Sequence, residues 1–152
     1  MTEIVRSDER IRATGEVFTP LRLVNEVLDK LPPEVWTDPS KTWLDPAAGD
    51  GNFLVEVKRR LMEAGGDEVH ILENQIFAAD IMPDNIRVLQ IRLGYLLGDG
   101  SSNLLLNRDN YRMDHAPDGT PYFHHWNIQC VDSLAYDFSF GRNDTSLEGF
   151  FD

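Results

Sequence analysis

The stretch from Thr42 to Leu54 constrains the fold most strongly, because a short apolar run leads through an acid and two glycines into a helical pattern. Gly49 and Gly51 allow positive φ angles and a close approach of the backbone to a ligand. The first N–H groups of the following helix attract anions such as a carboxylate, and Asp45 can accept a ligand amine. The stretch therefore predicts a strand–turn–helix unit that holds a polar small molecule. A purely structural turn is the alternative.

Two further stretches have the pattern of strands that lead into an acid: residues 75–80 end in Asp80, and the strand predicted within residues 127–134 ends in Asp132 and Ser133. Helical patterns follow the glycine loop and span roughly 84–97, so strands and helices alternate as in a parallel α/β sheet. The apolar faces of the two helices are Phe53, Leu54, Val57 and Leu61, and Ile86, Leu89, Leu93 and Leu96. Gly65-Gly66 is expected to end the first helix, with Lys58, Arg59 and Arg60 pointing outward. Asp80 is placed to accept both hydroxyls of a ribose, and a helix cap or turn role is its alternative.

The chain divides into a polar N-terminal arm, residues 1–14, and a single domain, residues 15–152. Arginines in the arm alternate with acids, which favours a solvated arm over a DNA contact. After Gly15, the sequence predicts an amphipathic helix with Thr19 as its N-cap and Pro20 in its first turn. Its apolar face is Leu21, Val24, Val27, Leu28 and Leu31, and Pro32-Pro33 ends it.

Residues 98–122 are rich in Gly, Asn, Asp and Ser and are long for a connection in an α/β protein. Asp118-Gly119 indicates a tight turn, as in a hairpin that leads into Tyr122-Phe123. His115, His124, His125 and Cys130 do not have the spacing of a zinc site, so we expect no metal. Cys130 is expected to be a small buried residue of the third strand.

Composition bears on partners and location. The net charge is -12, with 26 acidic and 14 basic residues, which disfavours direct binding to the phosphates of DNA. One cysteine excludes a disulfide within the chain and suits the cytoplasm. The charged N-terminus does not resemble a signal peptide, and no apolar run approaches the length of a membrane span.

Four motifs resemble adenine-specific DNA methyltransferases. The stretch from Asp45 to Leu54, DPAAGDGNFL, resembles their S-adenosylmethionine loop, Asp-Pro-Ala-Cys-Gly-Ser-Gly-x-Phe-Leu, and departs from it at Ala48 and Asp50. Residues 15–20, Gly-x-x-Phe-Thr-Pro, resemble the N-terminal motif that closes over the methionine end of the cofactor. Asp80-Ile81 and Asp132-Ser133-Leu134 resemble two further motifs that hold the ribose and the adenine.

The resemblance implies S-adenosylmethionine as cofactor, in an enzyme of DNA methylation such as those of restriction–modification systems. The implied cofactor-binding residues are Phe18, Thr19, Pro20, Asp45, Pro46, Ala47, Gly49, Gly51, Phe53, Asp80, Ile81, Asp132, Ser133 and Leu134. Asp45 and the glycines would surround the amine and carboxylate of the methionine end. Asp132 would accept the exocyclic amine of the cofactor's adenine, with Leu134 against the ring.

The implied fold is a truncated, Rossmann-like, three-layer α/β domain with strand order 3-2-1-4. The fourth strand is expected at residues 136–141, as an edge covered by residues 145–152, a second copy or a partner chain. In the family the next motif is Asn/Asp-Pro-Pro-Tyr/Phe, which holds the flipped target base. Residues 136–145 lack it, so the catalytic residues are unknown and a partner chain would supply them and the DNA contact. An inactive cofactor-binding or regulatory module and a small-molecule methyltransferase are the alternatives.

Overall fold

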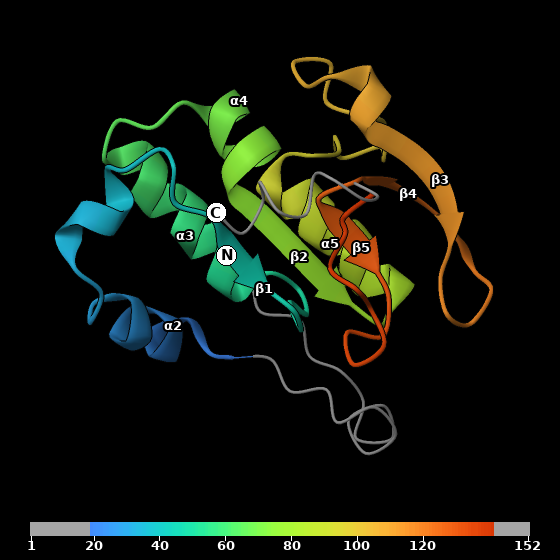
Figure 1. Cartoon of the computed structure of the whole chain (residues 1–152), viewed down its shortest axis with the longest axis horizontal. Helices are drawn as coiled ribbons and strands as arrows, with labels where there is room; N and C mark the ends of the chain where they lie inside the picture. The colour runs from blue at the N-terminus through green and yellow to red at the C-terminus, as the bar shows by residue number, and fades with distance from the viewer. Residues whose placement is uncertain (1–18, 142–152) are drawn as a thin grey trace.

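The computed structural model describes residues 19–141, in which a parallel sheet of three short strands carries the fold (Figure 1). The strands are β1 (Trp43–Asp45), β2 (Ile76–Asp80) and β5 (Ile128–Cys130), in the order β1-β2-β5. Asp45 pairs with Ala78, and Asp80 pairs with Cys130. All three strands therefore end at the same edge of the sheet. The predicted α/β class, with its short parallel sheet, is confirmed.

Two crossover helices connect these strands. They are α3 (Asn52–Glu63) and α5 (Pro83–Leu93), and right-handed crossovers in one direction place both on the same face of the sheet. The core between helices and sheet is apolar, formed by Leu54, Val57, Leu61, Ile76, Ala78, Ile86, Leu89 and Leu93. Burial of this stripe fixes both helices against the sheet.

The helix α2 (Leu21–Leu28) packs beside α3 at the lower left of Figure 1. Arg60 of α3 donates to Asn25 at 3.1 Å and to Asp29 at 2.8 Å. A short helical turn η1 (Pro33–Trp36) follows, and the Trp36 ring stacks on Trp43 with centroids 4.8 Å apart. The N-terminal layer is thus joined to α3 by polar contacts and to β1 by an aromatic pair.

The remaining elements precede β2 or separate α5 from β5. Between α3 and β2 lie α4 (Glu68–His70) and η2 (Ile71–Gln75), which is a π-helical turn. After α5 come η3 (Arg108–Asn110) and an antiparallel hairpin of β3 (Tyr111–His115) and β4 (Pro121–His125). The predicted hairpin is confirmed, with Gly119 at φ 89° in its turn. No helix within residues 19–141 is long and apolar enough to cross a membrane.

The expected fourth strand is wrong in the part of the chain that the structure describes. Residues 136–141 form irregular backbone and a turn, with Phe138 and Phe140 at positive φ. Phe140 is fully buried, and its ring lies edge-on to Phe77 at 5.3 Å. Of the alternating aromatic residues, Phe140 is the one buried against β2, and the segment makes no strand pairing. Among the described strands, β1 is therefore paired only with β2.

Several expected boundaries shift in the structure. The helix predicted over 84–97 ends at Leu93, where Gly94 takes φ 102°. The strand predicted over 127–134 covers only Ile128–Cys130. Pro20, and not Thr19, is the N-cap of α2, and no described side chain caps that helix. The arm, Phe18 and residues 145–152 lie outside the described residues.

The outward orientation expected for the basic side chains of α3 holds only for Arg59. The Lys58 side chain is 15% exposed and donates to Glu68 and to the Leu93 carbonyl, both at 2.7 Å. Arg60 is similarly covered because it reaches α2. These long side chains therefore join α3 to its neighbours.

Gly51→Ala should destabilise the chain by about 3 kcal/mol, because strain and overlap act together. Gly51 has φ 96°, and a Cβ there would lie 2.5 Å from Leu89 Cδ1. Gly65→Ala is the matched control, since Gly65 has φ 99° but no described atom within 4 Å of the added carbon. It should cost only about 1 kcal/mol. Urea unfolding measures both, and equal losses would contradict tight packing of the loop on α5.

Candidate functional site

Three acids lie where the parallel strands end. Asp45 ends β1, Asp80 ends β2, and Asp132 lies two residues beyond β5. The strand register sets their relative positions, because Asp45 pairs with Ala78 and Asp80 with Cys130. Carboxyl ends of parallel strands are where open α/β sheets bind ligands. The structure therefore brings together the three acids that the sequence predicted.

The glycine loop folds back over the end of β2. The Ala48 N–H donates to the Ala79 carbonyl at 2.9 Å, and the Gly49 N–H donates to Asp80 Oδ1 at 3.1 Å. Gly49 and Gly51 take φ 58° and 96°. Positive φ at both positions allows the loop to turn sharply from β1 into α3.

The Asp80 carboxylate has internal partners that sequence reasoning did not anticipate. Besides Gly49, it accepts from the Met82 N–H at 3.0 Å and from Asn85 Nδ2 at 2.9 Å. The residue is 9% exposed. Asp80 therefore joins the glycine loop to the start of α5, and a carboxylate with about four acceptor positions keeps one for a ligand.

The Asp45 carboxylate accepts fewer hydrogen bonds than the Asp80 carboxylate among the described residues. Its Oδ1 accepts the Ala47 N–H at 3.1 Å. Burial raises the pKa of the Asp45 carboxyl above its ordinary value, the Ala47 hydrogen bond offsets part of this, and the charge of Asp80 adds to the rise. A cation placed here would offset both the cost of burying the charged carboxylate and its repulsion by Asp80, so the site suits an ammonium group.

The start of α3 is suited to an anion. Its N-cap, Gly51, offers no side-chain acceptor to the first turn. Asp50 accepts the Asn52 N–H at 3.3 Å, and its negative charge faces Arg92 Nη1 at 3.5 Å. Because Arg92 balances Asp50, the first turn keeps the positive end of the helix dipole for a ligand carboxylate.

The other predicted residues differ in exposure. Pro46, Ala47, Ile81, Asp132 and Leu134 are exposed, and Thr19, Phe53 and Ser133 are partly buried. Asp132 accepts the Leu134 N–H at 3.0 Å within a turn, and Leu134 is 97% exposed. Pro20 is exposed at the start of α2, and Thr19 contacts the loop through its carbonyl.

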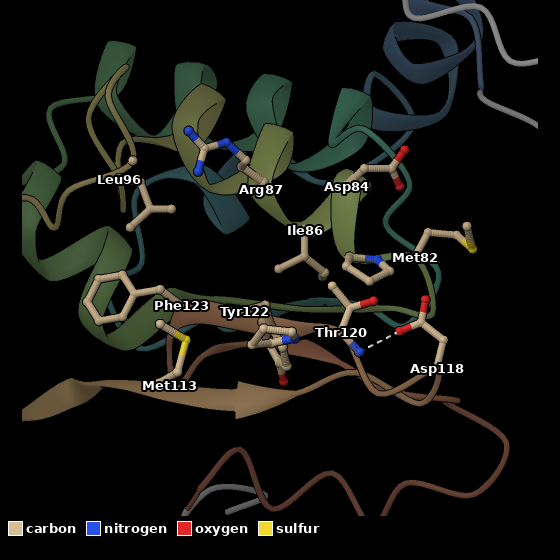
Figure 2. Close-up of a pocket in the computed structure, with 13 residues that line it drawn as sticks. Met82, Asp84, Ile86, Arg87, Leu96, Met113, Asp118, Thr120, Tyr122 and Phe123 are labelled. Atoms are coloured by element: carbon tan, nitrogen blue, oxygen red, sulfur yellow. Dashed lines mark hydrogen bonds between the residues drawn. The ribbon is translucent and has the colours of Figure 1, made fainter.

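A pocket that the sequence did not reveal lies between α5 and the hairpin, with a volume of about 640 Å³ (Figure 2). Ile86 and Leu96 lie on one side of it, and Met113, Tyr122 and Phe123 lie on the other. It begins at Met82–Asp84, just past Asp80, but none of the predicted site residues that the structure describes lines it. Its walls come from segments far apart in the sequence, so no local motif could have indicated it.

His124, His125 and Cys130 have structural roles here. His124 is fully buried and bonds Asp114 at 2.6 Å, and His125 bonds Glu73 at 2.6 Å. Burial raises the pKa of Cys130 to about 12, so its thiol is protonated at neutral pH and is no nucleophile. Within residues 19–141, His, Cys, Asp and Glu side chains nowhere gather in a group that could hold a metal ion.

Comparison with known proteins agrees with this geometry. Over 49 residues the chain is 43% identical to an uncharacterized adenine-specific methylase of Mycoplasma pneumoniae (strain ATCC 29342 / M129 / Subtype 1), a match that covers 30% of this chain and only 12% of that protein. Residues 6–109 match the N-6 DNA methylase family. This stretch contains the glycine loop and Asp80, and it extends over more than half of the 152 residues. The chain therefore belongs to the N-6 DNA methylase family.

Proposed function

We propose that the chain is the S-adenosylmethionine-binding part of an adenine-specific DNA methyltransferase. The observation that carries this proposal is the pairing of a partly buried Asp45 with the start of α3, whose N-cap Gly51 has no side chain to occupy it, on either side of a glycine loop. An amino acid group carries an ammonium and a carboxylate, and these two features match them. Membership of the N-6 DNA methylase family supports the same assignment.

The methionine end of the cofactor would lie over the loop. Asp45 would accept its ammonium, and the N–H groups at the start of α3 would receive its carboxylate. Gly49 and Gly51 leave room for this approach, with Pro46, Ala47 and Phe53 beside it. Phe18, Thr19 and Pro20 would cover the methionine end from the N-terminal side.

The adenosine end would extend toward β2 and β5. Asp80 would accept a ribose hydroxyl with its remaining acceptor position. The exposed side chains of Ile81 and Leu134, at 44% and 97% exposure, would lie against the adenine ring. Asp132 would accept the exocyclic amine, and Ser133 would lie beside it. These contacts stabilise the ring by burial and fix its orientation by hydrogen bonds.

The chemistry that the cofactor supplies is an activated methyl group. The chain's own role is to bind and orient, and we propose that a partner, a basic chain or a second polypeptide segment, brings the groups that hold the target adenine. Of the two edge strands of the sheet, β1 and β5, we propose β1 as the docking position, because it pairs only with β2 among the described strands and leads directly into the glycine loop. That edge lies beside the glycine loop.

Asp45→Asn should weaken S-adenosylmethionine binding about tenfold, because a charge-assisted hydrogen bond of about 1.5–3 kcal/mol becomes a neutral one of about 1 kcal/mol. Isothermal titration calorimetry of the whole chain measures this loss. Asp50 and Asp80 are poorer choices, since both have buried internal partners. Equal binding by wild type and variant, or no binding by the folded wild type, would contradict the proposal.

The same variant should be more stable than wild type at neutral pH. Because the pKa of Asp45 is raised in the folded state, the folded chain holds this proton more tightly than the unfolded chain. Stability is therefore lost as the pH rises from the ordinary aspartate pKa to the raised one. The uncharged amide of the variant would avoid that loss, and thermal melts from pH 4 to pH 7 should show the variant's advantage growing with pH.

The chain alone should bind duplex DNA with a Kd weaker than about 0.1 mM at physiological salt, the weak end of non-specific binding. The reason is its net charge of -12, which repels phosphates. Fluorescence anisotropy with a labelled duplex measures this. Micromolar binding with a steep salt dependence would show that the chain carries its own DNA-binding surface.

A further inference from the structure

A buried polar network lies under the glycine loop and connects it to α5. Arg92 Nη1 donates to the Asp50 carbonyl at 2.8 Å and to Asn52 Oδ1 at 3.1 Å. It also lies 3.5 Å from Asp50 Oδ2. One guanidinium therefore contacts a backbone group, an amide and a carboxylate of a single short segment.

The network continues to the N-terminal segment through Asn52. Asn52 Nδ2 donates to the Thr19 carbonyl at 2.8 Å, across 33 positions of sequence. The donor Arg92 faces the amide oxygen and the acceptor Thr19 faces the amide nitrogen, so the orientation of the amide is determined. Asn52 is thus the one residue of this loop whose side chain bonds both α5 and the segment before α2, among the contacts in residues 19–141.

Burial makes this network exacting. Asp50 is 1% exposed and Asn52 is 7% exposed. Removing a hydrogen-bond partner from a buried polar group destabilises the folded chain. Asp50 Oδ2 accepts no hydrogen bond from the described residues, and the guanidinium of Arg92 lies beside its charge. Arg92 therefore cannot swing away to another partner without leaving a buried charge uncompensated.

We propose that Asn52 is a positioning residue: it holds the segment formed by Thr19 and Pro20 against the start of α3, and Arg92 and Asp50 fix its amide for that purpose. The side chain of Asn52 acts through Thr19 and does not touch the ligand. Its consequence for the cofactor rests on the proposed function, because Thr19 and Pro20 would cover the methionine end only while this segment is held.

Asn52→Asp tests the contact selectively. The new carboxylate still accepts from Arg92, and a negative charge in the first turn of α3 is favourable, but an oxygen now faces the Thr19 carbonyl. Hydrogen exchange of the whole chain should become about tenfold faster at the Leu23 and Val24 amides, which donate to the Pro20 carbonyl at 3.0 and 3.1 Å. Exchange at the Ala78 amide in β2 should not change.

The control is Asn25→Asp, which adds the same charge on α2 and keeps an oxygen facing Arg60. It should leave exchange at Leu23 and Val24 unchanged. Asn52→Ala removes the Thr19 contact without adding charge and should accelerate exchange like Asn52→Asp. Unchanged exchange in both Asn52 variants, or equal acceleration in α2 and β2, would overturn the proposal.

Calorimetry extends the test to the cofactor. Both Asn52 variants should bind S-adenosylmethionine at least fivefold more weakly than wild type, and agreement between the charged and the neutral variant excludes simple repulsion. An affinity for S-adenosylmethionine that is the same in Asn52→Ala as in wild type would overturn the positioning role. Absence of binding in wild type would count against the proposed function instead, and the exchange result would then decide whether Asn52 holds the segment.

Discussion

The hydrogen bonds of the Asp80 carboxylate determine how the rest of the site is arranged. They join the glycine loop after β1, through Gly49, to the start of α5, through Met82 and Asn85. Without this acceptor, three donors at the carboxyl edge of the sheet would lose their hydrogen-bond partner, and the loop would no longer be bonded to the neighbouring strand. The parallel register of β1 and β2 makes the arrangement possible, since it places the end of β2 under the loop.

The site also concentrates like charge in a small volume, and this has a cost in stability. Burial disfavours the charged form of Asp45, and repulsion by the charge of Asp80 adds to that penalty. Asp50 is balanced by Arg92, whereas no basic side chain is within ion-pair distance of Asp45 among the described residues. A ligand ammonium would supply that missing balance, so the unfavourable electrostatics of the free chain become binding free energy in the complex.

Sequence reasoning succeeded where local pattern determines structure. The strand–loop–helix around Gly49 and Gly51, the buried strand ending at Asp80 and the hairpin turn at Gly119 all follow from short-range signals. It failed where tertiary contacts decide. Aromatic alternation near Phe140 suggested a strand, but burial of that one ring against Phe77 bends the backbone. The pocket between α5 and the hairpin and the hydrogen bond from Asn52 to Thr19 both involve segments far apart in the sequence, so no periodicity could reveal them.

Backbone NMR of the ¹⁵N-labelled chain, titrated with S-adenosylmethionine, tests whether the cofactor binds at the glycine loop, because it locates the ligand without altering the site. A cofactor bound at the loop should cause the largest shifts at the amides of residues 45–53 and 80–82, at the ends of β1 and β2. Shifts confined to the pocket between α5 and the hairpin, around Met113 and Phe123 (Figure 2), would place the ligand there and contradict binding at the loop. An unchanged spectrum would contradict cofactor binding altogether.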